Sequence, residues 1–426
     1  GVAASAGRSG STWSLDKAPA ISAAKAAADF VAQIFAEVAA PEPTPAVLPM
    51  AAQDGGESAA DPAQAPAEPA GRPGEGMAPL QDQNILILGL GASGLAMARW
   101  CVRCGAHVTV ADTRQLPPQL AALQQELPQV RFVAGAFGAH LVQGQGLHAV
   151  YRSPGLSPDS IAPVFVAASA MGISTGGELS LYSMALAALR AAHGYAPAVL
   201  AITGTNGKTT VTSLTGQLVE RAGKTVAVAG NIGPTLLDTL ASHIDAGTLP
   251  QVWVLELSSF QLDGVVDFEP TAATVLNITQ DHLDWHGDMQ AYAAAKARIF
   301  GQSAVMVLNR DEPAVMAMLP EPVRVKLQKP QQRAHTTFGG DMPRRPGDFG
   351  IEMVSGMAWL VRALESDETR KRGRSEEPEL HIQRLLPADA LRIRGRHNAI
   401  NALAALALAC EAGCALSPML YGLREY

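Results

Sequence analysis

A short stretch of the sequence has the residue types of a phosphate-binding loop. Its members, which are glycines, hydroxyl side chains, an amide and a lysine, are Gly204, Thr205, Asn206, Gly207, Lys208, Thr209 and Thr210. Glycines allow backbone N–H groups to close around phosphate oxygens at the start of a helix. Lys208 would hold the β and γ phosphates of ATP, and the Thr209 hydroxyl would bind the Mg²⁺ that bridges them. The motif departs from the usual pattern at Ile202, where the first glycine is expected.

Three charged side chains downstream are candidates for the same chemistry. Glu256 stands near the end of the apolar run Val252–Leu257, from where a second strand reaches the metal of a phosphate-binding loop, and its assignment depends on that loop. His282 lies in a polar loop, and it either binds a second metal or only hydrogen-bonds within the loop. Lys296 lies in a helical stretch, where taken alone it is a surface lysine with a solvated head.

A second glycine turn comes earlier in the chain. The apolar run Ile85–Leu88 is followed by three glycines within residues 89–94 and then by a helical stretch. A second strand ends at Asp112, which is where a fold of this kind meets a ribose. The turn fits a nicotinamide cofactor as well as a uridine nucleotide, so these residues alone leave the choice open.

Short apolar runs alternate with helical stretches along most of the chain. The runs of the strand type are Ile85–Leu88, His107–Ala111, Ala198–Thr203, Thr225–Ala229, Val252–Leu257, Ala273–Ile278 and Ala304–Asn309. Strands that alternate with helices predict parallel sheets covered on both faces. The predicted fold class is therefore α/β, with a Rossmann-like parallel-sheet domain at residues 81–196 and a central ATP-binding domain of the P-loop type at residues 197–426.

Two segments fall outside this alternation. Residues 1–80 are dominated by Ala, Pro, Gly and acidic residues, and they predict a disordered extension with one Ala-rich stretch, Ile21–Ala40, able to form an isolated helix. Residues 366–379 are densely charged and predict an exposed loop.

The composition excludes several classes of protein. The chain has 48% hydrophobic and 17% charged residues, without the run of about eighteen apolar residues that a membrane span needs. A net charge of -7 argues against a broad nucleic-acid-binding surface. The four cysteines are too few for a disulfide scaffold, which indicates a cytoplasmic protein, and no metal is assigned to the pairs Cys101/Cys104 and Cys410/Cys414.

These motifs, in this order, resemble the Mur ligases of peptidoglycan synthesis from about Asn84 to Tyr426. The stretch Leu255–Leu262 most resembles the members of the family that add D-glutamate. The resemblance implies ATP at the loop 204–210, with Asn398 and Asn401 as further nucleotide contacts, and it accounts for the missing first glycine. It also implies two Mg²⁺ ions and no NAD.

The resemblance assigns roles to further residues. It places the uridine end of the substrate in the first domain, at Ser93, Asp112, Thr113, Arg114, Ser153 and Gly155. It places Asn231, Ser258 and Gln261 against the muramoyl part of the substrate. It implies that Thr209, Glu256 and His282 bind magnesium, and that Lys296 is carbamylated and so becomes a carboxylate-like metal ligand, with Lys208 as the other catalytic lysine.

The implied reaction joins an amino acid to a sugar nucleotide. ATP would phosphorylate the carboxylate of UDP-N-acetylmuramoyl-L-alanine, and the amine of D-glutamate would attack the acyl phosphate, leaving ADP and phosphate. The protein is expected to be a monomer. Members of the family carry a third domain that binds the amino acid. We expect this domain to be absent from residues 1–426. The alternatives are another Mur or folylpolyglutamate-type ligase, a nicotinamide-dependent oxidoreductase, or an inactive nucleotide-binding fragment.

Overall fold

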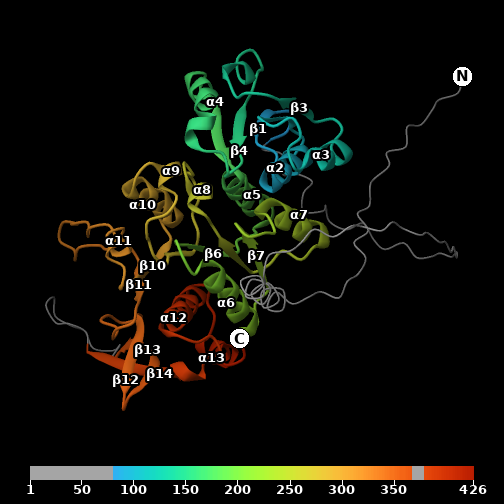
Figure 1. The fold of residues 1–426 in the computed structure, drawn as a ribbon. Coiled ribbons are helices and arrows are strands. Elements are labelled where there is room, and N and C mark those ends of the chain that lie inside the picture. The colour runs from blue at the N-terminus through green and yellow to red at the C-terminus, as the bar shows by residue number, and fades with distance from the viewer. Residues whose placement is uncertain (1–79, 367–378) are drawn as a thin grey trace, which may run out of the picture.

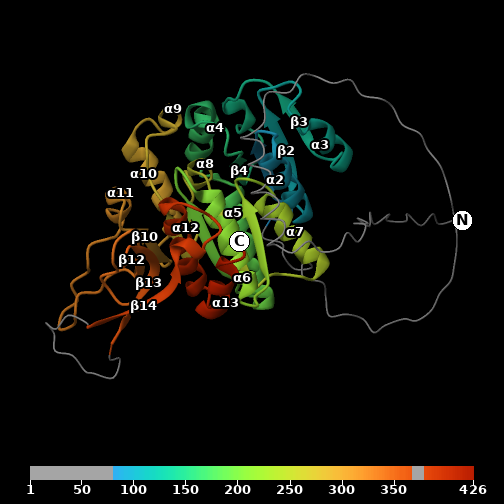
Figure 2. The same cartoon turned by 60° about the horizontal axis from the view of Figure 1, so that its bottom comes forward.

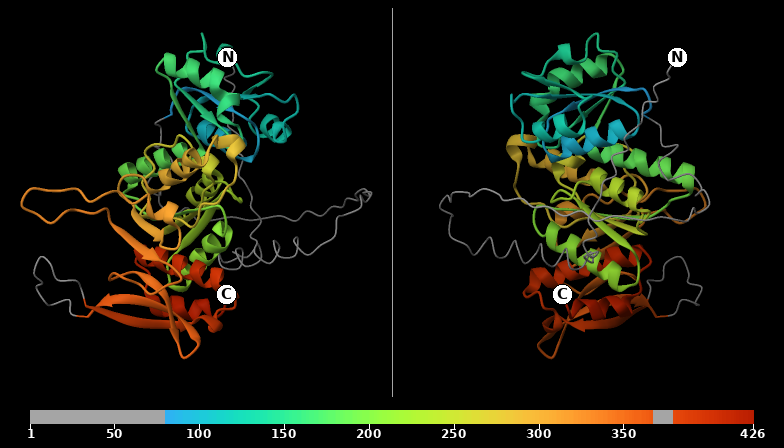
Figure 3. Two further views of the ribbon diagram at one scale, coloured as in Figure 1. Left: turned by 60° about the vertical axis from the view of Figure 1, so that its left-hand side comes forward. Right: turned by 90° about the vertical axis from the view of Figure 1, so that its right-hand side faces the viewer.

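The computed structural model describes residues 80–366 and 379–426 (Figure 1). The predicted extension, except for Leu80, and nearly all of the predicted loop 366–379 lie outside the described residues. Three sheets follow one another along the molecule, and Figure 3 shows them stacked from the blue end of the chain to the red end. No helix among the described residues is both long enough and apolar enough to cross a membrane.

The first sheet is parallel and has the strand order β3-β2-β1-β4-β5. Its strands are β1 (Asn84–Leu88), β2 (His107–Asp112), β3 (Arg131–Ala134), β4 (Ala149–Arg152) and β5 (Ser174–Gly177). The helices between and after them are α2 (Ala92–Arg103), α3 (Leu120–Glu126), η1 (Ala139–Leu141), α4 (Pro158–Ala170) and α5 (Glu178–His193). Residues Ile85–Leu88 are fully buried, as a central parallel strand requires. The predicted Rossmann-like sheet is confirmed.

The second sheet is also parallel and has the order β11-β10-β9-β6-β8-β7. Its strands are β6 (Ala198–Thr203), β7 (Val226–Gly230), β8 (Val252–Glu256), β9 (Ala272–Val275), β10 (Val305–Asn309) and β11 (His335–Phe338). The helices joined to them are α6 (Lys208–Arg221), α7 (Leu236–Ala246), α8 (Ser259–Leu262), α9 (Leu283–His286), α10 (Met289–Ala297), η2 (Arg298–Phe300) and α11 (Pro313–Met316). Every predicted strand forms, although β9 ends at Val275 instead of at Ile278.

The third sheet is antiparallel, and the sequence analysis did not anticipate it. Its strands are β12 (Phe349–Val354), β13 (Met357–Glu365) and β14 (Leu380–Pro387). One face packs on the buried helix α12 (Arg396–Glu411) through residues such as Leu360 and Leu386. Charged residues such as Glu352 and Arg384 interrupt β12 and β14, whereas β13 begins with the apolar run Met357–Val361. The chain then passes through η3 (Ala388–Ala390) before α12 and continues into α13 (Leu416–Leu423), and Figure 2 shows α12 beside α6.

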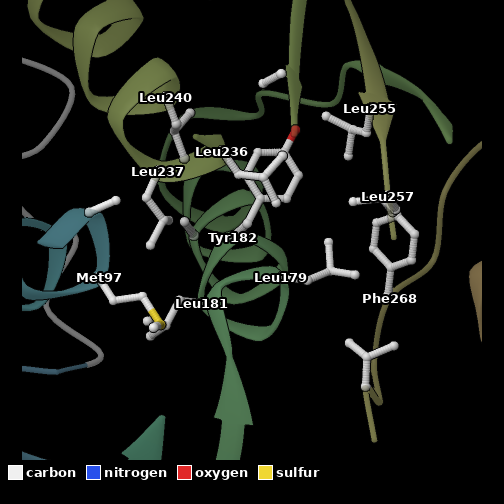
Figure 4. Close-up of a cluster of buried hydrophobic side chains, with 14 of the residues drawn as sticks. Met97, Leu179, Leu181, Tyr182, Leu236, Leu237, Leu240, Leu255, Leu257 and Phe268 are labelled. Carbon is white, nitrogen blue, oxygen red and sulfur yellow. The ribbon is translucent and has the colours of Figure 1, made fainter. Parts of the chain in front are cut away.

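Helix α7 follows β7 of the second sheet, but it packs on helices of the first. Figure 4 shows Leu236 and Leu237 of α7 facing Tyr182 of α5, in one buried apolar cluster. Two ion pairs add to this contact, because Arg99 and Arg103 of α2 reach Asp238 and Asp245 of α7 at 3.1 Å and 2.7 Å. The first two sheets are therefore joined through α2, α5 and α7.

The glycine turn at residues 89–94 gives a test of the close packing between the end of β1 and the start of α2. A Cβ on Gly94 would lie 2.0 Å from the Gly89 carbonyl oxygen, whereas a Cβ on Gly91 would meet nothing within 4 Å. We expect Gly94→Ala to lower the free energy of unfolding by about 3 kcal/mol or more, because backbone atoms must move to admit the methyl group. Gly91→Ala is the matched control and should cost less than about 1 kcal/mol. Urea unfolding of both variants measures the difference, and equal losses would contradict the steric argument.

Candidate nucleotide and substrate site

The loop between β6 and α6 is held in place by Asn277, two residues after the end of β9. The Asn206 N–H donates to the Asn277 side-chain oxygen at 2.8 Å, and the Asn277 amide donates back to the Asn206 carbonyl at 3.0 Å. The Thr205 N–H donates to the Asn277 carbonyl at 3.1 Å. Gly204 and Gly207 have φ values of 154° and 80°, in the region that favours glycine. The sequence analysis assigned no role to Asn277.

The N–H groups left for a phosphate lie at the start of α6. The Val211 N–H bonds to the Gly207 carbonyl at 3.0 Å, so the first turn of the helix leaves the N–H groups of Lys208, Thr209 and Thr210 without partners inside the helix. The Lys208 ammonium folds back over the loop and donates to the carbonyls of Gly204 and Thr205 at 2.8 Å and 3.3 Å. Burial lowers the pKa of Lys208, and the charges of Glu256 and Asp281 oppose that shift. This arrangement has the form of an anion site.

A carboxylate from the neighbouring strand faces the hydroxyl at the start of α6. The Thr209 hydroxyl donates to a Glu256 carboxylate oxygen at 3.4 Å. Burial raises the pKa of Glu256, and Lys208, Thr209 and Asn231 act in the opposite direction. The Asn231 N–H also donates to the Glu256 backbone carbonyl at 2.8 Å. The structure therefore brings together four predicted site residues, which are Lys208, Thr209, Asn231 and Glu256.

Lys296 is buried beside this group, so its assignment from the residues alone as a surface lysine is wrong. Its side chain is 2% exposed, and its ammonium donates to the Gly204 carbonyl at 3.1 Å. It also lies 4.6 Å from the centre of the Tyr292 ring. Burial, with a smaller contribution from the Lys208 charge, lowers the pKa of Lys296 to about 7. The two lysines thus share one carbonyl acceptor.

His282 and helix α8 form a separate group of predicted site residues. His282 is exposed and adopts a φ of 50°, with its ring 4.8 Å from that of Phe260 and a ring nitrogen 3.3 Å from an Asp281 oxygen. Ser258 and Gln261 bond to each other as the cap of α8, at 2.9 Å between the Ser258 N–H and the Gln261 side-chain oxygen. Gln261 also lines a cavity of about 380 Å³ between α8 and the first sheet.

The predicted uridine residues gather at the carboxyl ends of β1, β2 and β4. The Asp112 carboxylate accepts from the Leu90 N–H at 2.8 Å and from Arg114 at 2.7 Å. Burial opposes ionisation, but the hydrogen bonds from Arg114 and Leu90 outweigh it and lower the pKa of Asp112. The Ser153 hydroxyl donates to the Gly89 carbonyl at 3.1 Å. These bonds shape the glycine turn. The remaining predicted contacts on this edge, which are surface-accessible, are Thr113, Arg114 and Gly155.

The start of α12 reaches the phosphate-binding loop from the far end of the chain. Asn401 lies so close to Gly207 that a Cβ there would meet its side-chain oxygen at 3.2 Å. The Asn401 amide donates to the Asn398 side-chain oxygen at 3.4 Å, and the Asn398 amide donates to the Arg394 carbonyl at 2.8 Å. Both predicted nucleotide contacts thus lie at this edge of the loop.

The donor set near the loop suits a hard cation. Within residues 80–366 and 379–426, no group of three or more His, Cys, Asp and Glu side chains is arranged to hold a metal ion. Mg²⁺ commonly takes only one or two carboxylates from the protein, with phosphate oxygens and water as its other ligands. The oxygen atoms of Thr209 and Glu256 fit that pattern.

Sequence reasoning missed three residues at the site. Asn277 clamps the loop, and the Tyr292 hydroxyl lies 3.1 Å from the Thr205 hydroxyl. An i, i+4 spacing places Tyr292 and Lys296 on one face of α10, which was the available signal. Glu178, buried between the first two sheets, had no signal beyond its place at the start of a helix.

Comparison with known proteins agrees with this geometry. The family description "Mur ligase middle domain" matches residues 202–409, and "Mur ligase MurD-like, N-terminal domain" matches residues 83–177. The chain belongs to the Mur ligase family, whose members are ATP-dependent ligases of peptidoglycan precursors.

Individual relatives cover most of the chain. The UDP-N-acetylmuramoylalanine--D-glutamate ligase of Albidiferax ferrireducens is 72% identical over 350 residues, which are 82% of this chain and 69% of the relative. The protein of the same name from Polaromonas sp. is 59% identical, over 82% of this chain and 74% of the relative. A solved structure of the UDP-N-acetylmuramate:L-alanyl-gamma-D-glutamyl-meso-diaminopimelate ligase of Neisseria meningitides is 17% identical, with a TM-score of 0.46. The match covers 81% of this chain and 98% of the chain in that structure.

Proposed function

We propose that the protein binds ATP and UDP-N-acetylmuramoyl-L-alanine and acts in the addition of D-glutamate to the latter. The observation that carries the proposal is the convergence of Lys208, Thr209, Glu256 and Lys296 on the loop at Gly204. The names of the relatives supply the substrates. The domain boundaries proposed with this function are residues 81–196 for the uridine end and residues 197–426 for ATP.

The proposed reaction has two steps. The carboxylate oxygen of the alanyl group attacks the γ phosphorus of ATP, so a phosphorus–oxygen bond forms as the bond to ADP breaks. The D-glutamate amine then attacks the acyl carbon, loses a proton, and displaces phosphate to give an amide. Phosphorylation is needed first because a free carboxylate is a poor electrophile.

The residues of the chain position and neutralise the groups that react. Lys208, already within reach of the loop carbonyls, would turn its ammonium to the γ-phosphate oxygens, while the N–H groups of Thr209 and Thr210 would donate to the phosphate chain. Thr209, Glu256, His282 and a modified Lys296 would hold magnesium, which when bound neutralises phosphate charge. Asn231 and Gln261 would orient the muramoyl carboxylate.

Carbamylation of Lys296 is part of the proposal. A carbamate forms only from an unprotonated amine, and a pKa of about 7 leaves much of Lys296 unprotonated near neutral pH. Mass spectrometry under native conditions with bicarbonate tests the modification, and an unchanged mass would remove Lys296 from the set of magnesium ligands.

Isothermal titration with ATP, with NADH and with UDP-N-acetylmuramoyl-L-alanine tests the function. We expect ATP and the uridine ligand to bind and NADH not to bind. Phosphate release that depends on both the uridine ligand and D-glutamate is the matching activity assay. Binding of NADH alone would overturn the ligase proposal in favour of an oxidoreductase.

A further inference from the structure

Glu178 is a buried carboxylate at the junction of the first two sheets. It begins α5 directly after β5, and it is 4% exposed. One carboxylate oxygen accepts the Leu237 N–H at 3.1 Å. The Leu236 N–H and the Ser93 hydroxyl also face this carboxylate and act to lower its pKa. A buried acid with this many partners is fixed in position, since each unmade bond would be costly.

The two N–H groups that Glu178 accepts belong to the first turn of α7. The residue that precedes this helix, Thr235, makes no side-chain cap, and its hydroxyl is buried without a hydrogen-bond partner among the described residues. A carboxylate at a helix N-terminus satisfies free N–H groups and interacts favourably with the helix dipole. Glu178 therefore caps α7 from a different helix.

The partners of Glu178 lead to opposite ends of the proposed substrate site. Ser93 belongs to the glycine turn of the first sheet, where the uridine is proposed to bind. Helix α7 continues directly from residues 230–234, where Asn231 bonds to the backbone of Glu256 at 2.8 Å. One side chain thus faces Ser93 of the turn on one side and bonds to the helix behind the Asn231 loop on the other.

We infer that Glu178 is a positioning residue that sets the spacing between the uridine-binding turn and the loop that carries Asn231. The inference rests on the proposed function, because it assumes that one ligand spans both places. Glu178 is not part of the phosphate-binding loop, although it lines the same cavity as Gln261, and it would act through Ser93 and α7. Burial raises the pKa of Glu178 to about 7, with the three donors opposing that shift, which agrees with a tightly enclosed group.

Titrations with UDP and with UDP-N-acetylmuramoyl-L-alanine distinguish an effect on the spacing between the two places from an effect on uridine binding itself. UDP engages only the turn, whereas the longer ligand spans the turn and the Asn231 loop. We expect Glu178→Ala to weaken the affinity for the longer ligand by about tenfold. The affinities for UDP and for ATP should change by no more than about threefold. Glu178→Gln, whose amide oxygen still accepts the Leu237 N–H, should restore most of the lost affinity.

The matched control is Asp245→Asn, which removes an exposed ion pair to Arg103 at the other end of α7. It should leave all three affinities unchanged. Equal losses for UDP and the longer ligand, or no loss, in a folded Glu178→Ala protein would overturn the inference alone. Failure of the wild type to bind either uridine ligand would overturn the proposed function and the inference with it. If Glu178→Ala does not fold, Glu178→Gln takes its place in the test. An intermediate loss of affinity confined to the longer ligand then supports the inference. An unchanged affinity for the longer ligand together with a weakened affinity for UDP overturns it.

Discussion

Replacement of Lys208 by alanine is expected to weaken ATP binding by at least about 100-fold. The variant loses the ammonium group that folds back over the loop and donates to the Gly204 carbonyl at 2.8 Å. The affinity for UDP-N-acetylmuramoyl-L-alanine should change by less than about twofold, since the uridine turn belongs to the other parallel sheet. Isothermal titration of each ligand measures both effects.

An exposed lysine supplies the control for this experiment. Lys329→Ala removes the same charge from the surface and should leave both affinities unchanged. A comparable loss of ATP and of the uridine ligand in Lys208→Ala would contradict two separate nucleotide-binding places. Preserved ATP binding would contradict the phosphate-binding role of the loop.

Replacement of Lys296 by methionine is expected to change how stability depends on pH. The pKa of Lys296 is lowered to about 7 in the folded protein, from 10.5 in the unfolded chain. Between these values the unfolded chain holds a proton that the folded protein releases, so the stability of the wild type rises with pH across this window and levels off above it. Relative to the methionine variant, the rise should approach about 1 kcal/mol per pH unit.

Urea unfolding of the wild type and Lys296→Met at several pH values from 7 to 10 measures this difference. Buffers free of bicarbonate keep the lysine unmodified. The expected result is a methionine variant that is more stable than the wild type at pH 7 by a margin that shrinks as the pH rises. A constant margin would contradict the lowered pKa of Lys296.

The parallel sheets could be predicted from the sequence because their strands are buried on both faces. Runs such as Ile85–Leu88 are continuous and apolar, and each is followed by a helical stretch. The antiparallel sheet β12–β14 could not, since charged residues such as Glu352 and Arg384 interrupt two of its strands. Patterns of this kind are short and are easily interpreted as loops.

The site was predictable where its residues are adjacent in the chain, and less so where distant segments meet. The motif around Lys208 and Thr209 is local, and its place between a strand and a helix is confirmed. The burial of Lys296 depends on Tyr292 and on the Gly204 carbonyl 92 positions earlier, which only the fold brings close. Glu178 was still harder to predict from the sequence, because its partners belong to two other helices, α2 and α7.

The attachment of α7 has a mechanical consequence. Three polar links and an apolar cluster fasten this helix to the neighbouring unit, although its own strand belongs to the next one. A hinge between these two units would have to pull all of those links apart at once. Any opening and closing of the protein around its ligands is therefore expected to leave this pair moving as a single block, with the bending located elsewhere in the chain.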